Sequence, residues 1–159
     1  MARAVVFLAA GFEELEAVSI VDTLRRAGVE VVMAGLQAGA IEGGHGITIV
    51  PDTTIEEIEV EKFDAVILPG GYPGYVNLGR DGRVLDAVRS AFALGKVVAA
   101  ICGAPSVLAK AGLLSGKKAT IYPGMERELT GAKAVNKRVV VDGQIITSRG
   151  PGTAVEFAV

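Results

Sequence analysis

The stretch Val97-Val98-Ala99-Ala100-Ile101-Cys102-Gly103-Ala104-Pro105 joins a strand directly to a helix. Its apolar run before Cys102 is typical of a strand that is covered on both faces. Small residues stand on either side of Cys102, as a sharp turn from strand to helix requires. The segment therefore has the form of a nucleophile elbow, which would present the Cys102 sulfur at the carboxyl edge of a sheet.

The rest of the chain repeats this alternation of strands and helices. Short apolar runs predict strands, and apolar residues at helical spacing predict the helices between them. The glycine-rich segment 39–51 predicts a small hairpin-like excursion, and Pro151 stands where a last helix would begin. This order predicts an α/β domain whose parallel sheet has helices on both faces. The expected strands span 4–10, 29–34, 65–68, 96–101, 119–121 and 139–146, and the expected helices span 13–26, 81–94 and 104–111.

Composition limits what this domain can do. The 159 residues fit a single domain, 1–159, and half of them are apolar, which suffices for a sizeable core. A net charge of -2 gives no electrostatic case for binding nucleic acid or an acidic membrane surface. No apolar run reaches the roughly 18 residues of a membrane span, so we expect a soluble cytoplasmic protein. One cysteine and one histidine exclude an intrachain disulfide, a multi-cysteine metal site and a two-histidine site, and neither a metal nor a cofactor is expected.

Cys102 has two interpretations from spacing alone. As a nucleophile, it would lie at a helix N-terminus, where the helix dipole and free N–H groups favour the thiolate. As a structural residue, it would be an inert thiol buried at the end of an apolar strand, which is common for free cysteines. The spacing leaves these two interpretations balanced.

Glu16 can be placed beside Cys102. The segment Gly11-Phe12-Glu13-Glu14-Leu15-Glu16 opens the first helix, and Glu16 precedes two apolar residues at intervals of four, so it borders the buried face. This helix begins at the carboxyl edge of the sheet, the same edge as Cys102. A carboxyl group near the sulfur would have a raised pKa and could share or donate a proton. The alternative, a carboxylate stabilised by the helix dipole, fits the two preceding glutamates better.

Pro69-Gly70-Gly71 ends the third core strand at the same edge of the sheet. Glycine lets the backbone approach a ligand closely, and the N–H groups of Gly70 and Gly71 could receive an oxyanion. A plain turn explains the same three residues, and on the sequence alone it is the simpler interpretation.

These segments together resemble a known protein family. They occur in the family's order and cover nearly the whole chain: Gly11–Glu16, Arg25–Gly28, Leu68–Gly71, Ala100–Cys102 and Thr147–Thr153. The combination is similar to the ThiJ/PfpI superfamily, within the class I glutamine amidotransferase-like fold. It is most similar to the branch of the human parkinsonism-associated deglycase and bacterial YajL.

The resemblance implies a flavodoxin-like α/β/α sandwich with a mostly parallel sheet, usually as a homodimer. It implies that Cys102 is the reactive nucleophile and that Glu16 is a protonated acid hydrogen-bonded to the sulfur. It further implies that the backbone N–H groups of Gly71 and Gly103 face the substrate oxygen. Members of this branch are described as glyoxalases acting on methylglyoxal and glyoxal, or as deglycases acting on glycated proteins and nucleotides. Redox sensing and a chaperone role are also attributed to them.

Two positions depart from the family pattern. Tyr122 stands where many relatives have a histidine, and tyrosine, with a pKa near 10, is a poor general base at neutral pH. It could still hydrogen-bond a substrate in the pocket, and its presence puts more weight on Glu16. Gly103 stands where the peptidase branch has a histidine, which argues against a peptidase, and an amidotransferase also expects a Cys–His–Glu arrangement. The only histidine, His45, is either an exposed loop residue or one that reaches the pocket of a partner subunit.

The sequence thus favours a cysteine enzyme that needs no cofactor and acts on small reactive dicarbonyls or their glycation adducts. The alternative is a redox-sensing or chaperone protein that uses oxidation of Cys102 and has little turnover. Only eight residues follow Pro151, so we expect a short or truncated last helix. Its apolar residues Val155, Ala158 and Val159 would then be poorly covered, which favours a partner subunit.

Overall fold

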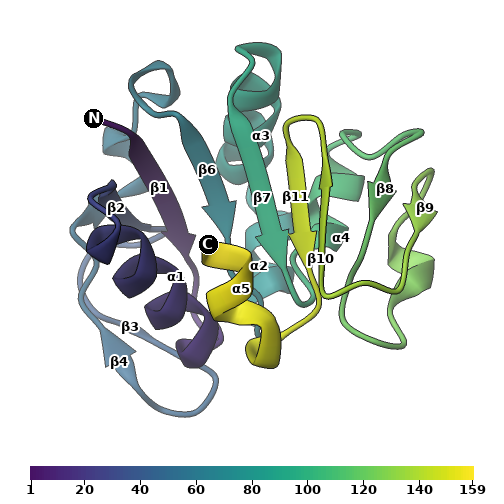
Figure 1. Cartoon of the computed structure of the whole chain (residues 1–159). Coiled ribbons are helices and arrows are strands. Elements are labelled where there is room, and N and C mark those ends of the chain that lie inside the picture. Colours follow the sequence, from purple (N-terminus) through teal and green to yellow (C-terminus); the bar gives the residue numbers. More distant parts are fainter.

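A seven-stranded sheet forms the centre of the molecule in the computed structural model, which describes residues 1–159 (Figure 1). Neighbouring strands run parallel, except for one antiparallel pair at an edge of the sheet. Across the sheet the strands are β10 (Val139–Asp142), β11 (Ile145–Ser148), β7 (Val97–Ile101), β6 (Ala65–Leu68), β1 (Arg3–Leu8), β2 (Glu30–Gly35) and β5 (Thr53–Thr54).

Helices cover both faces of this sheet. On one face lie α1 (Glu14–Arg26) and α5 (Ala154–Ala158), and on the other lie α2 (Gly74–Arg80), α3 (Gly82–Ala93) and α4 (Pro105–Lys110) (Figure 1). The alternation of side chains along β1 supplies both interfaces, since Val6 and Leu8 pack with α1 and α5 while Val5 and Phe7 pack with α3 and α4. The α/β/α sandwich expected from the sequence is thereby confirmed.

Local signals set the ends of α1. The Glu13 side chain accepts a hydrogen bond from the Leu15 N–H at 3.1 Å, which caps the helix. The buried face of the helix carries Ala17 and Ile20. The helix ends before Gly28, whose positive φ lets the chain turn toward β2. The connection from the end of β1 at Leu8 to the start of α1 at Glu14 is short, so the first turn of α1 lies at the carboxyl edge of the sheet.

Small elements complete the structure. The glycine-rich segment forms the expected hairpin, with strands β3 (Ile41–Glu42) and β4 (Thr48–Ile49). Strand β8 (Lys118–Ala119) does not join the main sheet as expected, because it pairs with β9 (Lys133–Ala134) in a sheet of two strands. Short 3-10 turns span Ile55–Glu57, Val60–Lys62, Glu126–Glu128 and Pro151–Thr153.

The last helix, α5, is short and lies beside α1 on the sheet (Figure 1). Its buried residues are Ala154 and Phe157, whereas Val155 and Val159 are exposed and Ala158 is half-buried. No helix of the structure is both long and apolar enough to span a membrane.

Candidate active site

Cys102 occupies the sharp turn between β7 and α4. Its φ of 65° makes it the one non-glycine residue with a positive φ. This conformation costs an L-residue roughly 1–2 kcal/mol, so neighbouring groups must hold it. The Cys102 N–H donates to the Ser148 carbonyl at 3.0 Å, and the Cys102 carbonyl accepts from the Tyr122 N–H at 2.9 Å. The turn thereby presents a half-buried thiol at the carboxyl edge of the sheet.

Glu16 lies next to this thiol. Its side chain is fully buried, and its Oε1 accepts a hydrogen bond from the Gly70 N–H at 2.9 Å. Its Oε2 is buried without a nitrogen or oxygen donor, and the titratable group that faces the carboxyl is the Cys102 thiol. A Cβ at Gly70 would lie 2.5 Å from the Cys102 Cβ and 2.9 Å from Glu16 Oε1, so glycine is required between them.

Burial decides the proton content of this pair. It raises the pKa of Glu16 to about 7, although the hydrogen bond from Gly70 opposes the shift. Burial, followed by the charge and hydrogen bond of Glu16, raises the pKa of the Cys102 thiol to about 12. Above pH 7 the pair therefore keeps one proton, which resides mainly on the sulfur. Transfer of this proton to Glu16 makes the sulfur a thiolate beside a neutral acid.

The pKa of Cys102 is raised, and not lowered as expected from the sequence. The helix that follows has only six residues and begins at Pro105, which has no N–H to offer the sulfur. The backbone N–H groups of Gly71 and Gly103 do lower the thiol pKa, but burial and the charge of Glu16 outweigh them. A reactive thiolate here depends on the protonation of Glu16.

The three glycines of the site have different roles. Gly71 and Gly103 direct their N–H groups at the Cys102 sulfur, where an oxyanion could form. Gly71 has a φ of 96°, and a Cβ there would clash with the Glu13 backbone nitrogen, so glycine is required at this position. The prediction that the Gly70 N–H could receive an oxyanion is wrong, because this N–H donates to the Glu16 carboxyl.

Tyr122 and His45 lie at the margins of the site. Tyr122 contacts Cys102 through its backbone N–H, and its side chain is 47% exposed. His45 is exposed in the β3–β4 turn, where its Nδ1 lies 3.2 Å from Glu14 Oε1 and 3.6 Å from Glu13 Oε2. These three residues bring potential metal-ligand atoms within 4.8 Å of one another. Backbone N–H groups already engage Glu14, so its place is explained by attachment of the hairpin.

Tyr75 is a neighbour of the site that the sequence interpretation missed. It comes from α2, a short helix that was not expected in the glycine-rich segment after β6. A Cβ at Gly103 would lie 2.5 Å from its ring, so the ring packs directly on the residue after the nucleophile. Burial raises the pKa of the Tyr75 hydroxyl, and the charges of Glu128 and Cys102 add to the shift.

Comparison with known proteins agrees with this architecture. The model of the DJ-1/PfpI family matches residues 2–159. Protein dj-1beta of Drosophila melanogaster is 48% identical over 158 residues, which are 98% of this chain and 84% of that protein. Its crystal structure superposes with a TM-score of 0.95 and 47% identity, over 99% of this chain and 86% of the other. Deglycase PfpI of Pyrococcus furiosus is 38% identical over 152 residues, covering 93% of this chain and 90% of that protein. The chain belongs to the DJ-1/PfpI family.

Proposed function

We propose that this chain is a cysteine-dependent enzyme that needs no cofactor and acts on small dicarbonyls or their glycation adducts. The observation that carries the proposal is the buried Glu16 carboxyl, with a pKa near 7, facing a strained Cys102 at a nucleophile elbow. Relatives that are named deglycases support the same reaction class. A carboxyl poised near neutral pH can both give and take a proton at physiological pH.

The first step uses the pair with its single proton on Glu16. The Cys102 thiolate attacks the aldehyde carbon of methylglyoxal, an S–C bond forms, and the carbonyl π electrons move to oxygen. The N–H groups of Gly71 and Gly103 stabilise this oxyanion. Glu16 then gives its proton to the oxygen, which produces a neutral hemithioacetal.

The later steps return every group to its starting state. The Glu16 carboxylate removes the proton from the former aldehyde carbon and passes it to the neighbouring carbonyl oxygen, which gives a neutral enediol. Glu16 then takes the proton of the hydroxyl on the first carbon and delivers it to the second carbon, which gives a thioester of lactate. Water cleaves the S–C bond and releases lactate, so methylglyoxal plus water becomes lactic acid with no oxidant or reductant.

Lactate formation from methylglyoxal tests this proposal. We expect Cys102→Ala to abolish turnover and Glu16→Gln to lower kcat by a factor on the order of 100 or more. Glu57→Gln removes an exposed carboxylate elsewhere and serves as the matched control. Equal rates in the parent and in both site variants would overturn the proposal.

Redox sensing is a second candidate, favoured by one observation. Cys102 is half-exposed and is the only cysteine, so its oxidation cannot end in an intrachain disulfide and would proceed to sulfenic or sulfinic acid. Intact-mass analysis after mild peroxide separates the two functions. An unmodified Cys102 together with robust lactate formation would argue against the sensor.

We also propose a homodimer. Leu15 and Val18 of α1 are exposed by 57% and 50%, and Ile47 of the adjacent hairpin is exposed by 58%. Large apolar side chains gathered in this way are typical of a protein interface. Sedimentation velocity of the parent and of Val18→Asp checks this proposal: we expect a dimer that the aspartate converts to a monomer.

A further inference from the structure

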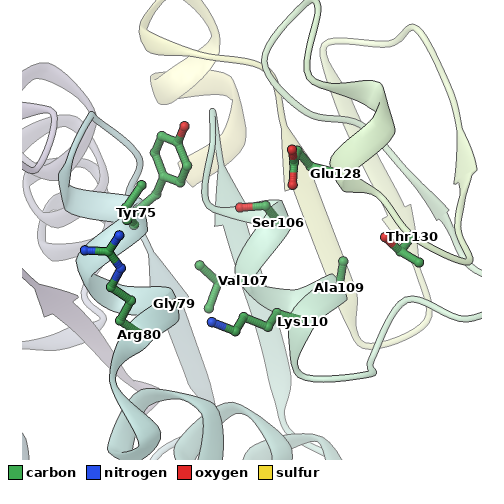
Figure 2. A pocket seen from close by; sticks show the side chains of 10 residues that line it. Tyr75, Gly79, Arg80, Ser106, Val107, Ala109, Lys110, Glu128 and Thr130 are labelled. Carbon is green, nitrogen blue, oxygen red and sulfur yellow. The ribbon is translucent and has the colours of Figure 1, made fainter.

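A cavity of about 470 Å³ lies between α2 and α4, beside the elbow. Figure 2 shows Arg80 and Lys110 on these two helices, with Ser106 above Lys110 on α4 and Glu128 on the opposite wall. The residues that line it are Tyr75, Val76, Gly79, Arg80, Ser106, Val107, Ala109, Lys110, Glu128 and Thr130.

The two cations of this cavity have no carboxylate partner in the protein. Neither Arg80 nor Lys110 takes part in an ion pair, although several exposed arginines of the chain do. Each lies in the last turn of its helix, where the helix dipole favours a cation. The dipole explains each residue singly, but it does not explain why both line one cavity together with hydroxyl groups.

Glu128, on the opposite wall of the cavity, limits the kind of ligand that the cavity could bind. Glu128 is an acceptor, and it lines the cavity together with Tyr75. Two cations against one carboxylate leave the cavity with an excess positive charge. It therefore suits an anion whose remaining part carries hydroxyl or amino donors for Glu128.

Two residues of the cavity wall contact Gly103 of the elbow. The Tyr75 ring packs on Gly103, and the Ser106 hydroxyl donates to the Gly103 carbonyl at 2.6 Å. Ser106 and Lys110 are four residues apart on α4, so they lie on one face of the helix about 6 Å apart along its axis. An anion held at Lys110 thus lies about one helical turn farther from Cys102 than Ser106 does.

We propose that this cavity binds the carboxylate or phosphate of a small hydroxylated or aminated ligand through Arg80 and Lys110. This ligand group is the remote end of a carbonyl compound whose reactive carbon reaches Cys102, an assignment that rests on the proposed function. The cavity would then select substrates by charge, whereas the elbow performs the chemistry.

Titration of ¹⁵N-labelled protein with inorganic phosphate and, separately, with acetate tests the site without turnover. We expect saturable shifts of the amides of Arg80, Ser106 and Lys110 with at least one anion, and the tighter of the two identifies the ligand group. Arg80→Gln and Lys110→Gln should each weaken binding about tenfold. Lys118→Gln removes an exposed charge outside the cavity and should leave the affinity unchanged.

The variant Glu128→Gln separates binding in the cavity from general attraction of anions to a basic surface. Loss of this carboxylate should tighten the binding of inorganic phosphate several-fold, because it removes a repelling charge. Absence of saturable shifts with both anions, or equal weakening by Lys118→Gln and Arg80→Gln, would overturn the proposal. A parent that binds the anion but forms no lactate would refute the proposed function and leave the anion site standing.

Discussion

Glu14 and Glu16 lie two residues apart in the first turn of α1, and both are buried, yet they hold their protons differently. Glu14 Oε2 accepts the N–H groups of His45 at 2.7 Å and Ile47 at 3.1 Å. Burial acts to raise the pKa of Glu14, but these and other hydrogen bonds together lower it. Glu16 receives one backbone N–H, and burial raises its pKa to about 7.

The balance between burial and hydrogen-bond donors decides which carboxyl is ionised: the donors outweigh burial at Glu14, and burial outweighs the Gly70 N–H at Glu16. Residues two apart on a helix point in nearly opposite directions, so Glu14 faces the β3–β4 hairpin and Glu16 faces the elbow. At the hairpin, converging N–H groups make the carboxylate an anchor. At the elbow, Glu16 Oε2 has no such donor, so the Glu16 carboxyl keeps its proton up to about pH 7.

The pH dependence of stability should show the largest consequence of this difference. Folded Glu16 keeps its proton up to about pH 7, whereas the unfolded chain releases it near pH 4.5, so the unfolded state binds fewer protons in this window. The stabilisation is therefore complete below pH 4.5 and is lost as the pH rises through 7, by about 3 kcal/mol. Urea unfolding at several pH values measures it, and Glu16→Gln should remove this contribution.

Glu14 acts in the opposite direction, which supplies the control for that experiment. Its lowered pKa gives stability that is present above pH 4.5 and is lost as the pH falls through the folded value. Glu14→Gln should therefore leave the decrease toward pH 7 in place. If the free energy of unfolding of Glu16→Gln depended on pH as that of the parent does, Glu16 would not be the group that holds this proton.

Loss of the Glu14 carboxylate should lower the free energy of unfolding by a smaller amount. In Glu14→Ala the N–H groups of His45 and Ile47 lose their acceptor, so we expect the free energy of unfolding at pH 7 to fall by about 2 kcal/mol. Glu14→Gln keeps an acceptor oxygen and should lose less. Urea unfolding of the three proteins measures the order, and a Glu14→Ala protein as stable as the parent would show that the hairpin does not depend on this carboxylate.

The reactivity of Cys102 provides a smaller and more local test. The pair loses its first proton near pH 7, so the rate of alkylation by iodoacetamide should rise about tenfold between pH 6 and 8. Glu14→Gln should retain this rise and its levelling-off above pH 7, whereas in Glu16→Gln, where burial still keeps the thiol pKa high, the rate should rise about tenfold per pH unit without levelling off. A rate that levels off near pH 7 in Glu16→Gln would mean that Cys102 ionises there without the acid.

Much of the fold could be predicted because its signals are local. The apolar runs gave the core strands, and the small residues around Cys102 indicated the elbow. Helical spacing placed Glu16 at the edge of a buried face, where the structure has it. Each of these patterns lies within about a dozen consecutive residues.

The remaining features depend on contacts between distant segments. Strand β8 pairs with β9 rather than with the main sheet, and the N–H of Gly70 is taken by Glu16, 54 residues away in the chain. Helix α2 has seven residues, begins with Gly74 and contains Gly79, so it is too short for a clear periodic pattern and Tyr75 was missed. The spacing of Glu14 and Glu16 indicates different faces, but not that a hairpin supplies donors to only one of them.

The smallest effect concerns Tyr122, a side chain that on the sequence alone could hydrogen-bond a substrate in the pocket. It holds the elbow through its backbone N–H, a contact that any residue except proline can make, and its side chain is about half exposed. Tyr122→Phe should therefore change kcat for methylglyoxal by less than about threefold, whereas Tyr122→Pro, which removes that N–H, should impair the turn itself. A large loss in Tyr122→Phe would assign proton transfer to the phenol and end the contrast between the two glutamates as an account of the chemistry. A small loss leaves Glu16 as the group whose protonation sets the state of the sulfur.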